Sequence, residues 1–218
     1  MASIQYTLAK ATDNATAFAG VSLSGSAIAQ DWRNLDAETA PSNFDQRHQI
    51  NATFQYTTGM GVGGGALIDG LKGKLYKGWT VTGNLIVGSG MPFTPIVQSL
   101  LAGSGVVGLL RPNVIGSTDA PSGYYLNRDA YAAPAAGQFG DAGRNSVVGP
   151  MQFTFNAGIT RTFQMTERLS ADWRIDATNV LNRLTYTGVN ATLGSNLFGL
   201  PANANTPRTL QTTIRMRF

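Results

Sequence analysis

Five charged residues near the end of the chain have the types and the spacing to form an ion-paired polar surface. They are Asp172, Arg174, Asp176, Arg215 and Arg217. In each group the charges are two residues apart, which places them on one face of a β-strand. If the two segments pair as antiparallel strands, carboxylates face guanidinium groups and help to fix the register. We favour this role; the alternative is that the same face contacts a ligand or a plug.

Other residues with catalytic or cofactor-binding potential lack the partners that such chemistry requires. His48 is the only histidine and the chain has no cysteine, which excludes sites built from two histidines or from thiolates. Gly59-Met-Gly-Val-Gly-Gly64 matches the glycine spacing of a dinucleotide-binding turn, but Gly70 and Gly73 interrupt the helix that should follow. We therefore expect no catalytic residue, no metal ion and no cofactor.

The composition favours a β-protein with a largely uncharged polar face. Only 13% of the 218 residues are charged, about half of the usual share. The net charge of +4 is spread along the chain, without the basic run that nucleic-acid binding requires. No segment approaches the roughly 18 consecutive apolar residues of a spanning helix. If this chain crosses a bilayer, it must do so as strands.

Six segments alternate between apolar and polar residues with the period of two that is typical of β-strands. The last is the clearest, because every second residue from Leu210 to Phe218 is apolar or Thr and those between are polar. The others cover residues 3–8, 50–57, 79–88, 152–163 and 169–178. Apart from the first, they are roughly nine residues long or longer, which is the length that a tilted strand needs to cross a bilayer. Aromatic residues stand near strand ends on the apolar face, where an interfacial girdle is expected, at Tyr56, Trp79, Phe153, Phe163 and Phe218.

The connections between these segments differ in length in a regular way. Long connections cover about 11–45, 90–150 and 181–206, and they alternate with shorter ones at 58–77 and 164–167. Outer-membrane barrels have short periplasmic turns and longer extracellular loops. If the carboxyl terminus is periplasmic, all three long connections are extracellular.

The pattern thus predicts an all-β, antiparallel, up-and-down transmembrane β-barrel segment of about six long strands, either closed or left as an open curved sheet. The five charged residues then face its lumen. Arg161 falls on the apolar face near the periplasmic end, where its side chain can reach the headgroups. The alternative is a soluble sandwich or barrel, whose strands also alternate.

Four stretches resemble the carboxyl-terminal part of Oar-like, TonB-dependent receptor barrels. They are Ser42-Asn-Phe-Asp-Gln-Arg-His-Gln-Ile-Asn-Ala-Thr-Phe54, Gly78-Trp-Thr-Val-Thr-Gly83 with Gly88-Ser-Gly-Met-Pro-Phe-Thr-Pro95, Phe139-Gly-Asp-Ala-Gly-Arg-Asn-Ser-Val-Val-Gly-Pro150, and Thr166-Glu-Arg-Leu169 with Asp176-Ala-Thr-Asn-Val-Leu-Asn182. Their order and spacing match that family, and the similarity extends over nearly the whole chain. The resemblance implies that Asp45 to His48 order the start of a strand near the outer rim.

This family implies a large barrel around an amino-terminal plug, with energy delivered by the TonB complex. Plugged transporter barrels have about 22 strands, whereas this chain holds about six and neither a plug domain nor a signal peptide. We therefore expect residues 1–218 to be the carboxyl-terminal segment of a receptor in the outer membrane of a Gram-negative-type bacterium, not competent for transport alone.

The resemblance also implies a set of partners. They are outer-membrane lipid, the remainder of the receptor with its plug and missing strands, the barrel-assembly machinery and the TonB complex. The assembly machinery would read Phe218 as a carboxyl-terminal signal, and the TonB complex would be contacted only through the missing amino-terminal part. We expect no nucleic acid. The competing function is an independent small β-protein that acts as an adhesin-like or secreted binding module.

Overall fold

The computed structural model describes most of the chain. The described residues are 1–14, 17–18, 21–22, 29–31, 33–60, 70, 73, 76–97, 110–166 and 169–218.

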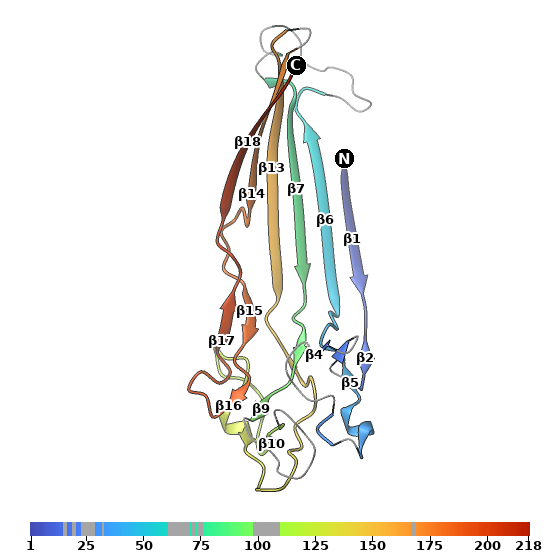
Figure 1. The fold of residues 1–218 in the computed structure, drawn as a ribbon, viewed down its shortest axis with the longest axis vertical. Helices are drawn as coiled ribbons and strands as arrows, with labels where there is room; N and C mark the ends of the chain where they lie inside the picture. Colours follow the sequence, from blue (N-terminus) through green and yellow to red (C-terminus); the bar gives the residue numbers. More distant parts are fainter. Residues whose placement is uncertain are drawn as a thin grey trace.

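Six long strands form one antiparallel sheet in which the order in space is the order along the chain. They are β1 (Ala2–Leu8), β6 (His48–Thr57), β7 (Trp79–Gly88), β13 (Gln152–Gln164), β14 (Ser170–Thr178) and β18 (Thr209–Arg217). Each pairs with the next, so the sheet is an up-and-down meander (Figure 1). The six predicted segments are confirmed; β1, with 7 residues, is shorter than the roughly nine residues that cross a bilayer.

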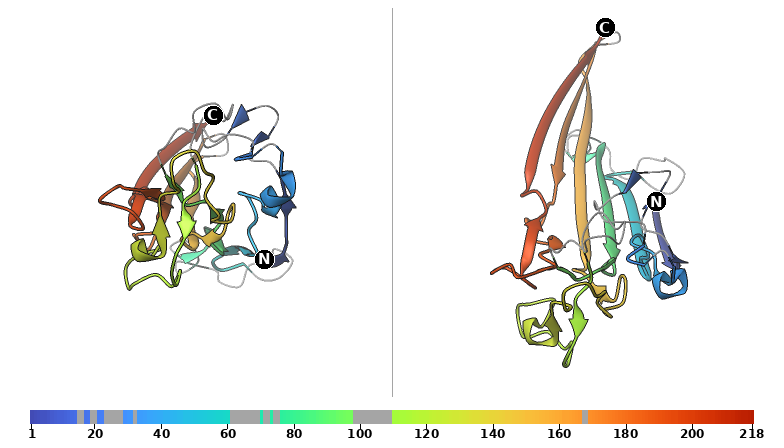
Figure 2. Two further views of the ribbon diagram at one scale, coloured as in Figure 1. Left: turned by 90° about the horizontal axis from the view of Figure 1, so that it is seen from below. Right: turned by 60° about the horizontal axis from the view of Figure 1, so that its bottom comes forward.

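The sheet is curved and does not close. Strands β1 and β18 are its two edges, and a view along the long axis shows the strands as an open arc (Figure 2). The predicted all-β antiparallel fold is confirmed in its open form. No helix among the described residues is long and apolar enough to cross a membrane.

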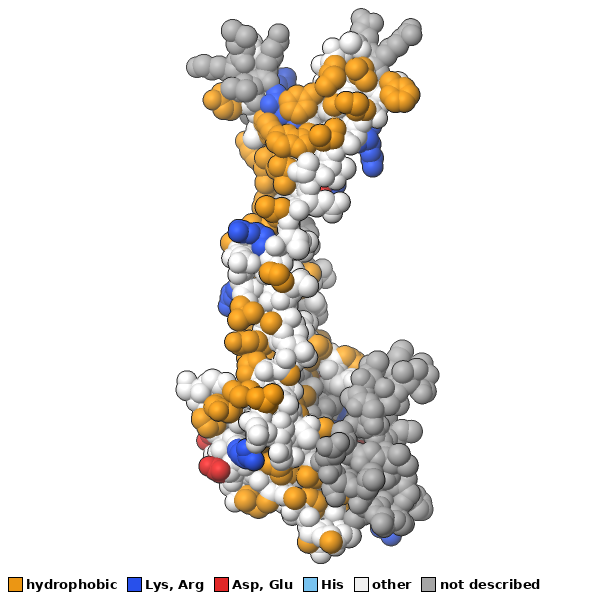
Figure 3. All heavy atoms as spheres, turned by 60° about the vertical axis from the view of Figure 1, so that its left-hand side comes forward, with side chains coloured by type: hydrophobic (Ala, Val, Ile, Leu, Met, Phe, Trp, Pro, Cys, Tyr) orange, Lys and Arg blue, Asp and Glu red, His pale blue; other side chains and the backbone are white. Residues whose placement is uncertain are grey.

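The register gives the sheet one apolar and one polar face, because directly paired residues share a face. One apolar row is Tyr6, Ile50, Val87 and Phe153, and another is Phe54, Gly83, Ala157, Ala177 and Leu210. Many apolar side chains remain open to the outside, including Ile4 (78% exposed) and Leu210 (69% exposed). Hydrophobic side chains follow the strands along the length of the molecule (Figure 3). A sheet buried in a soluble sandwich would be covered by a second layer, which the described residues do not supply.

Gly83 leaves space for an aromatic ring at the middle of the apolar face. A Cβ atom on Gly83 would lie 2.1 Å from Cε1 of Phe54, the residue that pairs with it on β6. The ring covers a glycine that has no side chain of its own to pack.

We expect Gly83→Val to lower the free energy of unfolding by about 1–3 kcal/mol, because the new side chain must displace the Phe54 ring. Urea titration of the complete barrel in lipid vesicles, with the edges β1 and β18 paired, measures the change. Gly123→Val is a control for backbone strain alone, because Gly123 has a φ of +86° but no heavy atom within 4 Å of the position of an added Cβ atom. If Gly83→Val is as stable as the wild type, the Phe54 ring does not pack tightly over Gly83.

The three long connections all lie at one end of the sheet, which we call the loop end; the opposite end is the turn end (Figure 1). Of the described residues, those within 9–47, 89–151 and 179–208 lie at the loop end, and those within 58–78 and 165–169 lie at the turn end. The predicted parity of long and short connections is therefore confirmed.

The three long loops together form a structure that we call the loop cap. Its short elements are β2 (Thr12–Asp13) with β5 (Ala40–Pro41), β3 (Ala17–Phe18) with β4 (Val21–Ser22), β8 (Pro92–Phe93) with β12 (Val147–Val148), β9 (Ile96–Val97) with β16 (Thr192–Leu193), β10 (Asn113–Val114) with β11 (Tyr131–Ala132), β15 (Tyr186–Val189) with β17 (Pro201–Ala204), and the 3-10 helices η1 (Leu35–Glu38) and η2 (Arg128–Ala130). The parallel pair β9–β16 joins the second loop to the third.

The buried hydrophobic cluster of the protein lies in the loop cap and not in the sheet. Its residues are Leu126, Ala130, Tyr131, Ala142 and Phe198. The rings of Tyr131 and Phe198 meet edge to face with their centres 5.8 Å apart. Since these residues come from the second and third loops, the cluster holds two loops together.

Candidate functional site

The structure brings the five predicted charged residues to the polar face of the pair β14–β18, near the turn end. Asp172 pairs in register with Arg215, and Arg217 pairs with Ser170 one step further along. With Thr160, Thr162 and Thr213, four of these residues line an open hollow of about 340 Å³: Asp172, Arg174, Arg215 and Arg217. The polar face is therefore hollowed where its charges gather; its role as a lumen wall remains a prediction.

The ion pairs at this hollow differ in detail from a simple cross-strand ladder. Arg217 Nη2 lies 2.7 Å from Asp172 Oδ2, a diagonal contact across the strands, while Arg174 Nε donates to Asp176 Oδ2 at 2.6 Å along its own strand. Thr162 Oγ1 donates to Asp172 at 2.7 Å. Because the arginine side chains are exposed, each pair contributes at most about 1 kcal/mol. Arg215 forms no ion pair with any residue that the structure describes.

On the opposite, apolar face an arginine is held among aromatic rings at the turn end. Arg161 pairs in register with Trp79 on one side and with Trp173 on the other. Its guanidinium carbon lies 5.0 Å from the ring centre of Trp79 and 4.8 Å from that of Phe163. Such cation–π contacts offset part of the cost of a charge on an apolar surface. The aromatic residues thus gather where the sequence predicts an interfacial girdle.

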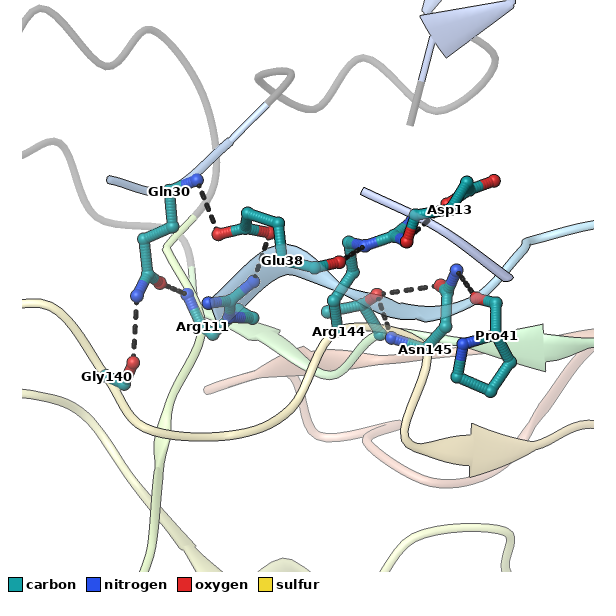
Figure 4. Close-up of polar contacts among 9 residues, drawn as sticks. Asp13, Gln30, Glu38, Pro41, Arg111, Gly140, Arg144 and Asn145 are labelled. Atoms are coloured by element: carbon teal, nitrogen blue, oxygen red, sulfur yellow. Dashed lines mark hydrogen bonds and ion pairs between the residues drawn. The ribbon is translucent and has the colours of Figure 1, made fainter. Parts of the chain in front are cut away.

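A buried polar network joins the first and second loops of the cap (Figure 4). The Glu38 carboxylate, in a residue only 2% exposed, accepts a 2.6 Å hydrogen bond from Arg111 Nη1. The Gln30 backbone N–H donates to Glu38 at 3.0 Å, and the Gln30 side chain accepts from the Arg111 backbone N–H at 2.7 Å and donates to the Gly140 carbonyl at 2.8 Å. A buried ion pair needs such additional hydrogen bonds to offset its desolvation.

Two further residues of the second loop extend this network toward the sheet. Arg144 Nε donates to the Glu38 carbonyl at 2.7 Å, and its Nη2 forms an ion pair with Asp13. The Asn145 side chain donates to the Pro41 carbonyl at 2.7 Å, from a backbone in the left-handed region with φ of 49°. These contacts hold the β2–β5 pair against the second loop, so specific side-chain contacts order the loop cap.

With this geometry established, the comparisons with known proteins assign the family. The sequence matches the family described as outer membrane beta barrel domain over residues 1–211. The chain belongs to this family. No curated protein and no solved structure matches the chain.

Membership of the outer membrane beta barrel domain family accounts for both faces of the sheet. It confirms the predicted location in the outer membrane of a Gram-negative-type bacterium and the resemblance as far as an outer-membrane barrel. In such barrels the outward face is apolar and contacts lipid, and the lumen is polar. We therefore expect the exposed apolar rows of this sheet to face lipid.

The segment from Asp45 to His48 orders the loop end of this outer membrane beta barrel domain. Asp45 accepts from the Ala11 backbone N–H at 2.7 Å, and the Gln46 side chain donates to the Ser89 carbonyl at 3.1 Å. His48 Nδ1 lies 2.8 Å from the Tyr6 hydroxyl. These contacts connect the ends of β1, β6 and β7, in agreement with the predicted structural role.

Two other features singled out in the sequence are the terminal Phe218 and the glycine motif at 59–64. Phe218 follows β18 with a fully exposed side chain, and its role as an assembly signal remains a prediction. In the glycine motif, residues 61–64 lie outside the described residues. None of the described residues forms a cluster of three or more His, Cys, Asp or Glu that would hold a metal ion.

The network in the loop cap leaves almost no trace in the sequence pattern. The Glu38–Arg111 partners are 73 residues apart and the Glu38–Arg144 partners 106 residues apart, so strand periodicity does not relate them. The only sequence signal is Arg111, which is an isolated charge in a stretch of small and apolar residues. Such charges are rarely buried unless they are paired.

The loop cap should lose stability at high pH because of Tyr131. Burial raises the pKa of its phenol above the ordinary value of about 10. The folded cap then holds the proton more tightly than the unfolded cap, so stability is constant below about pH 10 and falls as the pH rises toward the raised pKa. Near-ultraviolet circular dichroism during heating, at a series of pH values, measures this loss. In Tyr131→Phe the decline should be smaller; an identical decline would assign it to other groups.

Proposed function

We propose that this chain supplies part of the wall and of the ligand-catching loops of an Oar-like, TonB-dependent outer-membrane receptor. The observation that carries the proposal is the loop cap: three long loops fold together, over a buried cluster and a buried ion-pair network, at one end of a sheet with a hollowed polar face. A wall segment with no ligand to catch needs no ordered loops of this size. Loops held by a rigid scaffold are the usual place for binding residues.

The remainder of the receptor would complete the barrel. Strands β1 and β18 each pair on one side only among the described strands, and open edges are not tolerated in lipid. Six strands are also fewer than the eight of small outer-membrane barrels. In this proposal the missing strands close the ring, so this chain alone is not competent for transport.

The charged hollow would lie on the path of the ligand. A ligand caught by the loop cap passes along the polar face when a plug moves, and the plug contacts the charges around Arg215. The TonB complex delivers the energy through a part of the receptor outside this chain, and the barrel-assembly machinery inserts the barrel. This role includes no catalytic step.

The orientation can be tested with single cysteines, because the chain has none of its own. Ser122 lies in the loop cap and Met165 at the turn end, and both are exposed. We expect a membrane-impermeant maleimide to label Ser122→Cys on intact cells and Met165→Cys only after permeabilisation of the outer membrane. Labelling in the reverse order would overturn the proposed topology.

Uptake is tested in the bacterium that carries the gene. Intact cells with and without the gene receive labelled oligosaccharide, peptide and metal-chelate probes, with and without an ionophore that collapses the proton gradient. We expect loss of the gene to lower uptake of at least one probe, and the ionophore to abolish that difference. If uptake of every probe is unchanged while attachment of the cells to surfaces is lost, the adhesin-like function is favoured instead.

A further inference from the structure

We propose that a hollow beside Arg183, at the loop end of the apolar face, binds the phosphorylated headgroup of an outer-leaflet glycolipid. The hollow measures about 210 Å³, and its lining includes Phe153, Arg183, Thr185, Tyr125 and Tyr186. It is separate from the charged hollow of the polar face. The inference shares with the proposed function only the extracellular position of the loop cap, and it requires no uptake.

The cation of this hollow is well positioned, and among the described residues it has no counter-charge. The guanidinium carbon of Arg183 lies 4.5 Å from the ring centre of Phe153. No residue in the described part of the chain forms an ion pair or a side-chain hydrogen bond with it. A planar guanidinium group that is stacked on a ring still presents its N–H donors at its edge, in a geometry suited to phosphate oxygens.

The backbone that carries Arg183 is fixed by two asparagines. Asn179 accepts from the Arg183 backbone N–H at 3.0 Å and donates to its carbonyl at 3.1 Å, and Asn205 donates to the same carbonyl at 3.0 Å. Asn179 itself is buried and has a φ of 48°. Because the site is ordered in advance, binding of an anion costs little further conformational entropy.

A second polar group in the lining also lacks a partner. The hydroxyl oxygen of Thr185 is buried and forms no hydrogen bond within the described structure. Buried polar groups are nearly always satisfied, and an orphan of this kind needs an explanation. Rotation of the Thr185 side chain would bring this hydroxyl into the hollow, where an oxygen of a bound headgroup accepts from it while the phosphate contacts Arg183.

The surroundings of the hollow indicate a lipid and not a soluble anion. Met151 and Leu184, which also line it, are 48% and 62% exposed, and Phe153 belongs to the apolar face that we expect to face lipid. A volume of about 210 Å³ is below the roughly 300–1,000 Å³ that encloses a whole small ligand. It suits a headgroup whose acyl chains lie along the exposed apolar rows.

The positions of Phe153 and Arg161 along β13 match the two interfaces of a membrane. Phe153 and Arg161 are eight residues apart on β13, about 27 Å at roughly 3.4 Å per residue. At a strand tilt of about 40° this length corresponds to roughly 21 Å of height, and the apolar band of an outer-membrane barrel is about 25 Å tall. The two arginine–aromatic clusters therefore lie near its two edges. With the loop cap outside the cell, Arg183 faces the outer leaflet, which phosphorylated glycolipid forms in Gram-negative-type outer membranes. The phenols of Tyr125 and Tyr186 suit such an interface.

Native mass spectrometry of the full chain, extracted from outer membranes in a mild detergent, tests the proposal. The probes are lipid A, dephosphorylated lipid A, phosphatidylglycerol and inorganic phosphate. We expect the wild type to bind lipid A most tightly, and Arg183→Gln to weaken this binding about tenfold through loss of a charge-assisted contact. Arg183→Lys should retain part of the affinity, and Thr185→Val should weaken it less. Arg128→Gln, in the loop cap but outside the hollow, is the matched control and should not change it.

Several results would overturn the proposal. They are unchanged binding of lipid A by folded Arg183→Gln, equal binding of dephosphorylated lipid A or of phosphatidylglycerol by the wild type, and binding of inorganic phosphate alone. Heat-dependent migration in gels shows whether each variant is folded. If Arg183→Gln does not fold, the comparison of the four probes on the wild type still decides the question.

Discussion

Replacing Arg111 with methionine should open the loop cap. The substitution removes the charge that faces the buried Glu38 carboxylate, while a side chain of similar length remains. An uncompensated buried charge costs about 3–5 kcal/mol, so the cap should unfold locally far more often than in the wild type. Amide hydrogen exchange measures this opening at backbone N–H groups inside the cap, such as those of Val97 and Ala142, which bond to the Leu110 and Pro112 carbonyls.

The Arg33–Asp31 pair provides the matched control, because it lies in the same loop as Glu38 but its arginine is 69% exposed. Arg33→Met should cost less than about 1 kcal/mol. The double variant Glu38→Met with Arg111→Met should recover much of the loss, since no buried charge is left without a partner. Equal exchange in Arg111→Met and Arg33→Met would show that the buried network does not hold the cap.

A charge at the middle of the apolar face should impair folding only if that face meets lipid. Leu210 is 69% exposed in this sheet and shares a row with Ala157, midway along β13 between Phe153 and Arg161. In water, Leu210→Arg would change stability by no more than about 0.5 kcal/mol. At the midplane of a bilayer the same change costs about 2–4 kcal/mol. Folding of the complete barrel, including the strands that pair with β1 and β18, into lipid vesicles, followed against urea, separates these two values.

Two controls on the same strand make this test specific. Met216→Arg lies on the same face near the turn end and should cost only about 0–1 kcal/mol, because the cost falls toward the interface. Gln211→Arg, on the polar face beside Leu210, should be tolerated. An equal, small effect at Leu210 and Met216 would contradict a lipid-facing surface.

Local periodicity was sufficient to predict the sheet. Alternation along β6 and β18 identified the strands, and the lengths of the connections placed all long loops at one end. It succeeded because a strand repeats every two residues and each face must match a single medium. The same reasoning placed Arg161 on the apolar face, but it did not predict the aromatic rings that surround the guanidinium group.

The local sequence pattern specifies the six strands, their order, which face is apolar, and the end at which the long loops gather, because all of these depend on residues close together in the chain. Three features are evident only in the folded protein: the sheet stays open, Glu38 meets Arg111 inside the loop cap, and Arg183 lies over Phe153. Those contacts join residues from different loops and strands. No repeating pattern encodes them, because the path of each loop depends on packing against the others.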